Sequence, residues 1–76
     1  MDRKSEKRTS FKRLANNRVN RVLKDLNLVG NLSNSQNYSY SEKDIKVIFK
    51  AIDSELSIAK SRFNAVLNRK NSIKIK

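Results

Sequence analysis

The sequence predicts an all-α protein, an antiparallel two-helix hairpin with heptad-like packing that dimerisation or a partner completes. The 76 residues include no proline and one glycine, so little in the chain interrupts a helix. Apolar residues recur at alternating spacings of four and three in two long segments, which is the period of one helix face. A polar, asparagine-rich stretch separates these segments. We therefore expect a single helical hairpin domain, residues 1–76.

The first helix is expected over about residues 6–28. Ser5 or Ser10 is a candidate N-cap, because a serine hydroxyl accepts hydrogen bonds from the first free backbone N–H groups. Gly30 stands where a residue in the left-handed conformation would end the helix. The apolar face of this helix consists of Phe11, Ala15, Val19, Val22, Leu26 and Val29, joined by Leu14 and Leu23.

The second helix is expected over about residues 42–68. Ser41 as N-cap and Asp44 at the third helical position approximate a capping box, with Asp in place of the usual Glu or Gln. Tyr40 and Ile45 stand at the positions of a hydrophobic staple. The heptad seam of this helix, of the kind seen in a coiled coil, consists of Ile45, Phe49, Ile52, Leu56, Ala59, Phe63 and Val66.

The connector between the helices, residues 29–41, is longer than most helix-helix connections. Two interpretations stay open. Leu32, Tyr38 and Tyr40 either fold back as a structural cap over the end of the hairpin, or they form a contact surface for a partner. The basic tail is expected over residues 69–76. Its last six residues, "NSIKIK", are too short to form structure alone, and two interpretations stay open: they are disordered, or they pair with an extended partner.

Composition argues against most kinds of catalysis. The chain has no Cys and no His, which removes disulfides, Cys/His zinc sites, thiol nucleophiles and imidazole acid-base chemistry. The seven carboxylates are scattered among eighteen Lys and Arg residues, so hard metal ions have no clustered ligands. We expect no enzyme and no cofactor. The charged N-terminal segment resembles neither a signal peptide nor a membrane anchor, which predicts a cytoplasmic protein with no membrane partner.

Net charge is the strongest functional signal. A charge of +11 on a small chain predicts an anionic partner, with nucleic acid as the first candidate and an acidic membrane surface as the second. Residues 1–30 carry +6, residues 31–59 carry −1 and residues 60–76 carry +6. Antiparallel pairing would merge the two basic segments into one cationic pole. A genome rich in A·T, which favours Lys and Asn codons, is the competing explanation of part of this composition.

The predicted contacts lie on the polar side of the first helix and at the pole. Arg side chains bind phosphates or guanine edges, and Asn amides pair with adenine or with backbone oxygens. We favour RNA over DNA, because Arg- and Asn-rich helices and stacking tyrosines suit structured RNA. The predicted nucleic-acid-binding residues are Arg13, Asn17, Asn20, Arg21 and Lys24, with Lys60, Arg62, Arg69 and Lys70 completing the pole.

A second seam on the other side of the second helix predicts a protein partner. Its residues are mostly small, which permits close approach of another helix. The occupant would be a second copy, giving an antiparallel four-helix dimer, or a groove on a larger protein or ribonucleoprotein. The alternative function is therefore that of a protein-protein interaction subunit or regulator. The seam consists of Val47, Ala51, Ser54, Ile58, Ser61 and Ala65.

One stretch resembles other proteins. Residues 16–63, about two thirds of the chain, contain the segments "GNLSN" and "NYSY" before a helix. In these segments the chain resembles short uncharacterised basic proteins of bacterial and mobile-element genomes. The resemblance implies that the connector is more than a spacer. It includes no catalytic motif and implies no activity.

Overall fold

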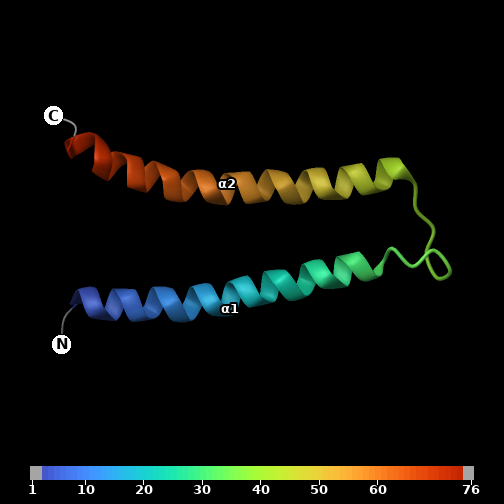
Figure 1. Cartoon of the computed structure of the whole chain (residues 1–76), viewed down its shortest axis with the longest axis horizontal. Coiled ribbons are helices and arrows are strands. Elements are labelled where there is room, and N and C mark those ends of the chain that lie inside the picture. Colours follow the sequence, from blue (N-terminus) through green and yellow to red (C-terminus); the bar gives the residue numbers. More distant parts are fainter. Residues whose placement is uncertain (1–2, 75–76) are drawn as a thin grey trace. The chain divides into compact units, whose positions relative to one another are not determined.

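The computed structural model describes residues 3–74, with side chains as far as residue 69. It contains helix α1, Arg3–Asn31, and helix α2, Glu42–Lys74, joined by a non-helical segment (Figure 1). The all-α prediction is confirmed for the described residues. The chain divides into two compact units, Met1–Ser39 and Tyr40–Lys76, and the structure defines each unit separately. The pairing of the two helices into a hairpin therefore stays a prediction.

Helix α1 begins earlier than predicted. It includes Ser5 and Ser10, so neither serine is an N-cap and that prediction is wrong. The hydroxyl of Thr9 donates a hydrogen bond of 3.0 Å to the backbone carbonyl oxygen of Ser5, one turn before it. A threonine inside a helix commonly satisfies its hydroxyl in this way. The highly charged start of the chain is thus helical from Arg3.

Helix α1 also ends later than predicted, and Gly30 does not end it. Gly30 lies inside the helix and does not have a positive φ, so the prediction of a left-handed glycine is wrong. The N–H of Leu32 donates to the carbonyl oxygen of Val29 at 3.0 Å, and the N–H of Ser33 donates to that of Gly30 at 3.0 Å. These i to i+3 bonds satisfy the last carbonyl groups by tightening the final turn, so no left-handed residue is needed.

The connector continues as local turns. The side-chain oxygen of Asn34 accepts a hydrogen bond of 3.0 Å from the N–H of Gln36, which is an Asx turn. The carbonyl oxygen of Asn34 accepts from the N–H groups of Asn37 and Tyr38, at 3.2 and 3.0 Å. One asparagine therefore orders the centre of the connector. Leu32 and Tyr38 are 46% and 50% exposed, so their side chains are not buried by this arrangement.

Helix α2 begins where the sequence predicts, at a reciprocal capping box. The N–H of Asp44 donates to the hydroxyl oxygen of Ser41 at 3.1 Å, and the N–H of Ser41 donates to a carboxylate oxygen of Asp44 at 3.0 Å. Two otherwise free donors are satisfied, and the carboxylate stands at the positive end of the helix dipole. Tyr40 and Ile45 line one shallow hollow together with Glu42 and Lys46, as expected of a hydrophobic staple.

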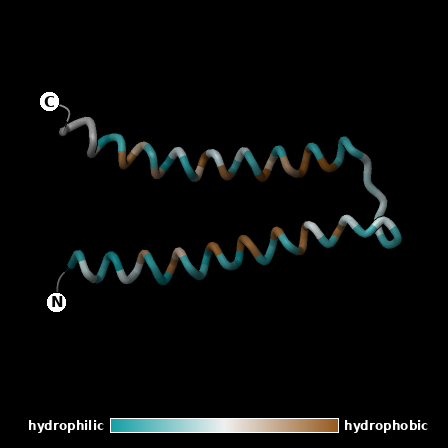
Figure 2. The backbone as a smooth tube through the Cα atoms, in the orientation of Figure 1, coloured by the Kyte–Doolittle hydropathy of each residue, from teal (hydrophilic) through white to brown (hydrophobic). Residues whose placement is uncertain are grey.

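Helix α2 continues to Lys74, past the predicted end near residue 68 and through most of the predicted basic tail. Figure 2 shows apolar residues recurring along α2 between hydrophilic ones. Their side chains remain accessible, because no described residue is buried. Ile45 and Ile52 of the heptad seam are half-buried, whereas Phe63 is 60% exposed.

The capping box generates a first prediction. Replacing Ser41 by alanine should lower the free energy of unfolding of α2 by about 0.5–2 kcal/mol, since the N–H of Asp44 loses its acceptor. Amide hydrogen exchange of residues 44–49 measures this effect. Ser39→Ala, on the connector outside the box, is the matched control and should leave exchange unchanged. Equal protection in both variants would show that the box does not stabilise the helix.

Gly30 leads to a second prediction, that alanine at this position stabilises the helix. A Cβ at Gly30 meets nothing within 4 Å, and the backbone there is helical. Gly30→Ala should therefore stabilise the end of α1 by about 0.4–1 kcal/mol, because alanine loses less backbone entropy on folding. Helix content and thermal unfolding followed by circular dichroism measure the change. Destabilisation instead would indicate a left-handed glycine at this position in solution.

Candidate nucleic-acid interface

One continuous line of polar side chains runs along α1. Starting at Arg13, its members are four, three, four, three and four residues apart, so the winding of the helix keeps them on one side. All are exposed. The line is about 27 Å long at 1.5 Å per residue. We name it the α1 polar stripe, and its members are Arg13, Asn17, Asn20, Lys24, Asn27 and Asn31.

The stripe lies on the side of α1 away from its apolar face. Ala15 and Val29, the two half-buried residues of the helix, lie on the roughly opposite side. Arg21 lies about 80° around the helix from the centre of the stripe, and Lys12 lies about 100° away on the other side. The stripe therefore has a cationic side chain on each flank. Of the predicted contact residues on α1, four belong to the stripe and Arg21 is beside it.

Asparagine is an unusual choice for this position. Five of the ten asparagines of the chain are in α1, and four of these five belong to the α1 polar stripe. Each costs about 0.5–0.7 kcal/mol of helix propensity relative to alanine, since its short amide competes for backbone groups. An exposed helix face gains nothing structural from them. Their amides each present a donor and an acceptor to a ligand.

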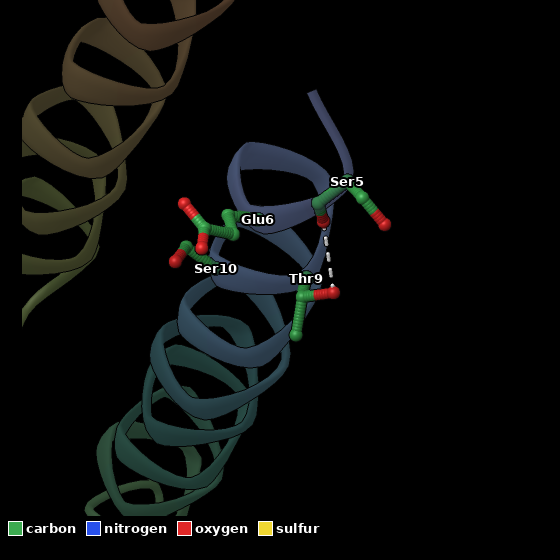
Figure 3. Close-up of a pocket in the computed structure, with 4 residues that line it drawn as sticks. All are labelled: Ser5, Glu6, Thr9 and Ser10. Carbon is green, nitrogen blue, oxygen red and sulfur yellow. Dashed lines mark hydrogen bonds between the residues drawn. The ribbon is translucent and has the colours of Figure 1, made fainter. Parts of the chain in front are cut away.

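The start of α1 is chemically different from the stripe. Ser5, Glu6, Thr9 and Ser10 line an open hollow there, and in Figure 3 the side chains of Glu6 and Ser10 lie next to each other. The carboxylate of Glu6 would repel a phosphate group. We therefore place the candidate interface on the stripe and not in this hollow.

Arg8 contacts an aromatic ring, a feature that the sequence analysis missed. Its guanidinium carbon lies 6.0 Å from the centre of the Phe11 ring, at the outer limit of a cation-π interaction. The spacing of three residues on a helix was the available signal. This contact directs one basic group towards the apolar side of α1, away from the α1 polar stripe.

The predicted basic residues of α2 do not form one cluster within that helix. Arg62 and Arg69, seven residues apart, lie on the same side, whereas Lys60 is about 160° away from Arg62. The side chain of Lys70 lies outside the described residues. A basic line that the analysis missed is formed by Lys43, Lys46 and Lys50, whose spacings of three and four place them on one exposed side of α2.

The predicted partner seam of α2 is a continuous and accessible line. All six of its residues, Val47 to Ala65, are exposed. Val47 and Ile58 are 61% and 50% exposed, which leaves two branched apolar side chains in water. The line lies roughly opposite the heptad seam, about 150° around the helix.

The described part of the chain contains no candidate metal site and no candidate membrane span. No group of three or more Asp or Glu side chains is close enough there to hold a metal ion. Neither helix, over its described residues, has a window sufficiently long and apolar to cross a membrane.

Comparisons with models of protein families, with curated proteins and with solved structures give no match. The resemblance of residues 16–63 to short basic proteins of bacterial and mobile-element genomes therefore stays a prediction. Any function assigned to the chain depends on the chemistry of its surfaces.

Proposed function

We propose that this chain is a small, non-enzymatic nucleic-acid-binding accessory subunit. The observation that carries the proposal is the α1 polar stripe, in which Arg13 and Lys24 are each followed by two asparagines along one exposed helix face. Arginine and lysine bind phosphate oxygens and release counterions, while asparagine amides can bond to bases or to the backbone. The net charge of +11 favours a polyanion over any other ligand.

The proposal includes the antiparallel hairpin, completed by dimerisation or by a partner. Its support is the exposure of the apolar faces: Leu26 is 37% exposed on α1, and Phe49 and Phe63 are 42% and 60% exposed on α2. Isolated helices are marginally stable in water and gain most of their stability from packing such faces. Antiparallel pairing would join the two basic segments into one cationic pole.

Both RNA and DNA fall within the proposal, as do a cytoplasmic location and an origin in a mobile element. RNA was favoured because Tyr38 and Tyr40 could stack on unpaired bases. Tyr38 is 50% exposed and available for this, while Tyr40 lines a hollow with Ile45.

A salt series tests the proposal. We expect the full chain to bind a structured RNA or a DNA duplex with an affinity that falls steeply with salt. Replacing Arg13, Arg21 and Lys24 together by glutamine should flatten the slope of log affinity against log salt by about 2–3 units, since about one counterion is released per phosphate contact. Fluorescence anisotropy at several salt concentrations measures the slope.

The matched control replaces Lys43, Lys46 and Lys50 by glutamine. It removes the same three positive charges from the net +11, but from α2. If the two triple variants lose affinity equally, net charge and not the α1 face would account for binding. If the unaltered chain binds neither polymer at moderate salt, the nucleic-acid proposal fails.

A second candidate function is that of a protein-protein interaction subunit or regulator. The observation that favours it is Ile58, which is 50% exposed at the centre of the partner seam of α2. Fully burying an exposed aliphatic side chain contributes about 1.5–3 kcal/mol, so a partner that covers the exposed half of Ile58 gains about half of this.

Ile58→Asp tests this candidate. If the seam is an interface between copies, the variant should lower the mass measured by light scattering from that of a dimer to that of a monomer, because a buried unpaired carboxylate is costly. Ser57→Asp introduces the same charge at a neighbouring position that points about 100° away, and should leave the mass unchanged. The same mass in both variants and in the unaltered chain would exclude this seam as a self-association surface.

A further inference from the structure

The geometry points to a more specific ligand: the α1 polar stripe binds in the major groove of duplex DNA and contacts adenine. This inference rests on the proposed function and names the substrate class of the same site. Three properties of α1 lead to it: the shape of the helix, the chemistry of its asparagines and the placement of its cations.

The shape of α1 favours duplex DNA. Helix α1 is unbroken from Arg3 to Asn31, and the stripe occupies one exposed side of it. An α-helix with its side chains is about 10–12 Å across, and the major groove of B-form DNA is about 12 Å wide. The major groove of A-form RNA is deep and narrow, and side chains do not read bases there. Of the two features that favour RNA, the tyrosines lie on the connector and not on this helix. The Arg- and Asn-rich character of α1 serves equally well for base contacts in the major groove of DNA.

The chemistry of the stripe favours adenine. The asparagine amide offers one acceptor and a donor group in a plane. Adenine presents the complementary pair in the major groove, the N7 acceptor and the N6 donor, so that one Asn makes two bonds to one base. Asn17 and Asn20 stand between Arg13 and Lys24 in the centre of the stripe. We assign these two asparagines to adenine contacts.

The cations are placed to bind the walls of the groove. With the stripe directed at the floor of the groove, Arg21 and Lys12 project from the two flanks of α1. The walls of the groove carry the phosphates of the two strands, which position a protein without carrying sequence information. The bases would then be read by the asparagines, and the backbone would be held by the flanking cations together with the long side chains of Arg13 and Lys24, which extend from the stripe to phosphates.

The experiment measures binding of the full chain to three DNA duplexes of equal length, and to a structured RNA, by fluorescence anisotropy at one salt concentration. The first contains several adenines, the second contains only G·C pairs, and the third replaces each adenine of the first by 7-deazaadenine. That base lacks the N7 acceptor but keeps Watson-Crick pairing and an unaltered minor groove. We expect the second duplex to bind about 5- to 150-fold more weakly than the first for each lost bidentate contact. The third duplex loses one of the two bonds of each contact and should bind about 2- to 12-fold more weakly for each.

Variants connect the preference to named residues. Asn20→Ala should reduce the difference between the affinities for the adenine and deazaadenine duplexes, because only Asn17 would still contact an adenine. Asn64→Ala, the same substitution at an exposed position of α2, should preserve the difference. Alanine is the better helix former, so loss of helix does not explain the result; circular dichroism verifies this.

The outcomes separate this inference from the proposed function. Equal, salt-dependent binding to all three duplexes would overturn adenine contact and leave the nucleic-acid proposal standing. A preference for the adenine duplex that survives the deaza substitution would show that N7 is not contacted, so that the minor groove or another major-groove group is read, and would also overturn the inference. Tighter binding to a structured RNA than to any of the duplexes would also overturn the inference. Absence of binding to every polymer would overturn both.

Discussion

Every surface of this protein depends on one constraint, the winding of the α-helix at 3.6 residues per turn. None of the described side chains is buried, so burial does not determine which residues share a face. Helical geometry alone places Arg13, Asn17 and Asn20 on one side of α1 and Val22 on the other. The same geometry separates the heptad seam of α2 from its second seam. Continuous backbone hydrogen bonding is therefore what organises both candidate binding surfaces.

The end of α1 and the start of α2 are stabilised by different kinds of hydrogen bond. Ser41 and Asp44 satisfy free N–H groups with their side chains and begin α2 at a defined residue. At the end of α1 the backbone satisfies its own carbonyl groups, through bonds from Leu32 to Val29 and from Ser33 to Gly30. A start determined by side chains tolerates little change in sequence, whereas a tightened last turn depends on backbone alone. The connector then needs only Asn34 to organise its turns.

The high net charge and the asparagine content both lower the stability of the chain when no partner is bound. A net charge of +11 on 8.8 kDa repels itself, and the asparagines of α1 weaken the helix that carries them. A polyanion bound along α1 would relieve the repulsion and would engage the amides. The exposed apolar faces also favour a bound partner. Covering Phe63 and Ile58 with another surface would lower the free energy, because apolar area would be removed from water. The composition thus favours a protein that acts as part of an assembly.

Much of the fold and of the candidate site is encoded in short-range patterns. Spacings of three and four residues determined where the polar and apolar faces of each helix lie, and the serine three positions before an aspartate determined where α2 begins. For the same reason the sequence predicts contact residues at Arg13, Asn17, Asn20 and Lys24. These features depend on residues within one or two turns of each other, so the sequence by itself determined them.

Only the three-dimensional structure decided how far each helix extends. Gly30 is compatible with a helical and with a left-handed backbone, and the bonds of the tightened last turn selected the helical one. The same applies to the start of α1, where Ser5 and Ser10 are equally suited to a cap or to a helix interior, and the helix begins at Arg3. In α2 the structure continued the helix to Lys74, where the sequence has no glycine or proline to stop it. Residue type leaves such positions undecided, because the backbone hydrogen bonds that select between the conformations exist only in the folded chain.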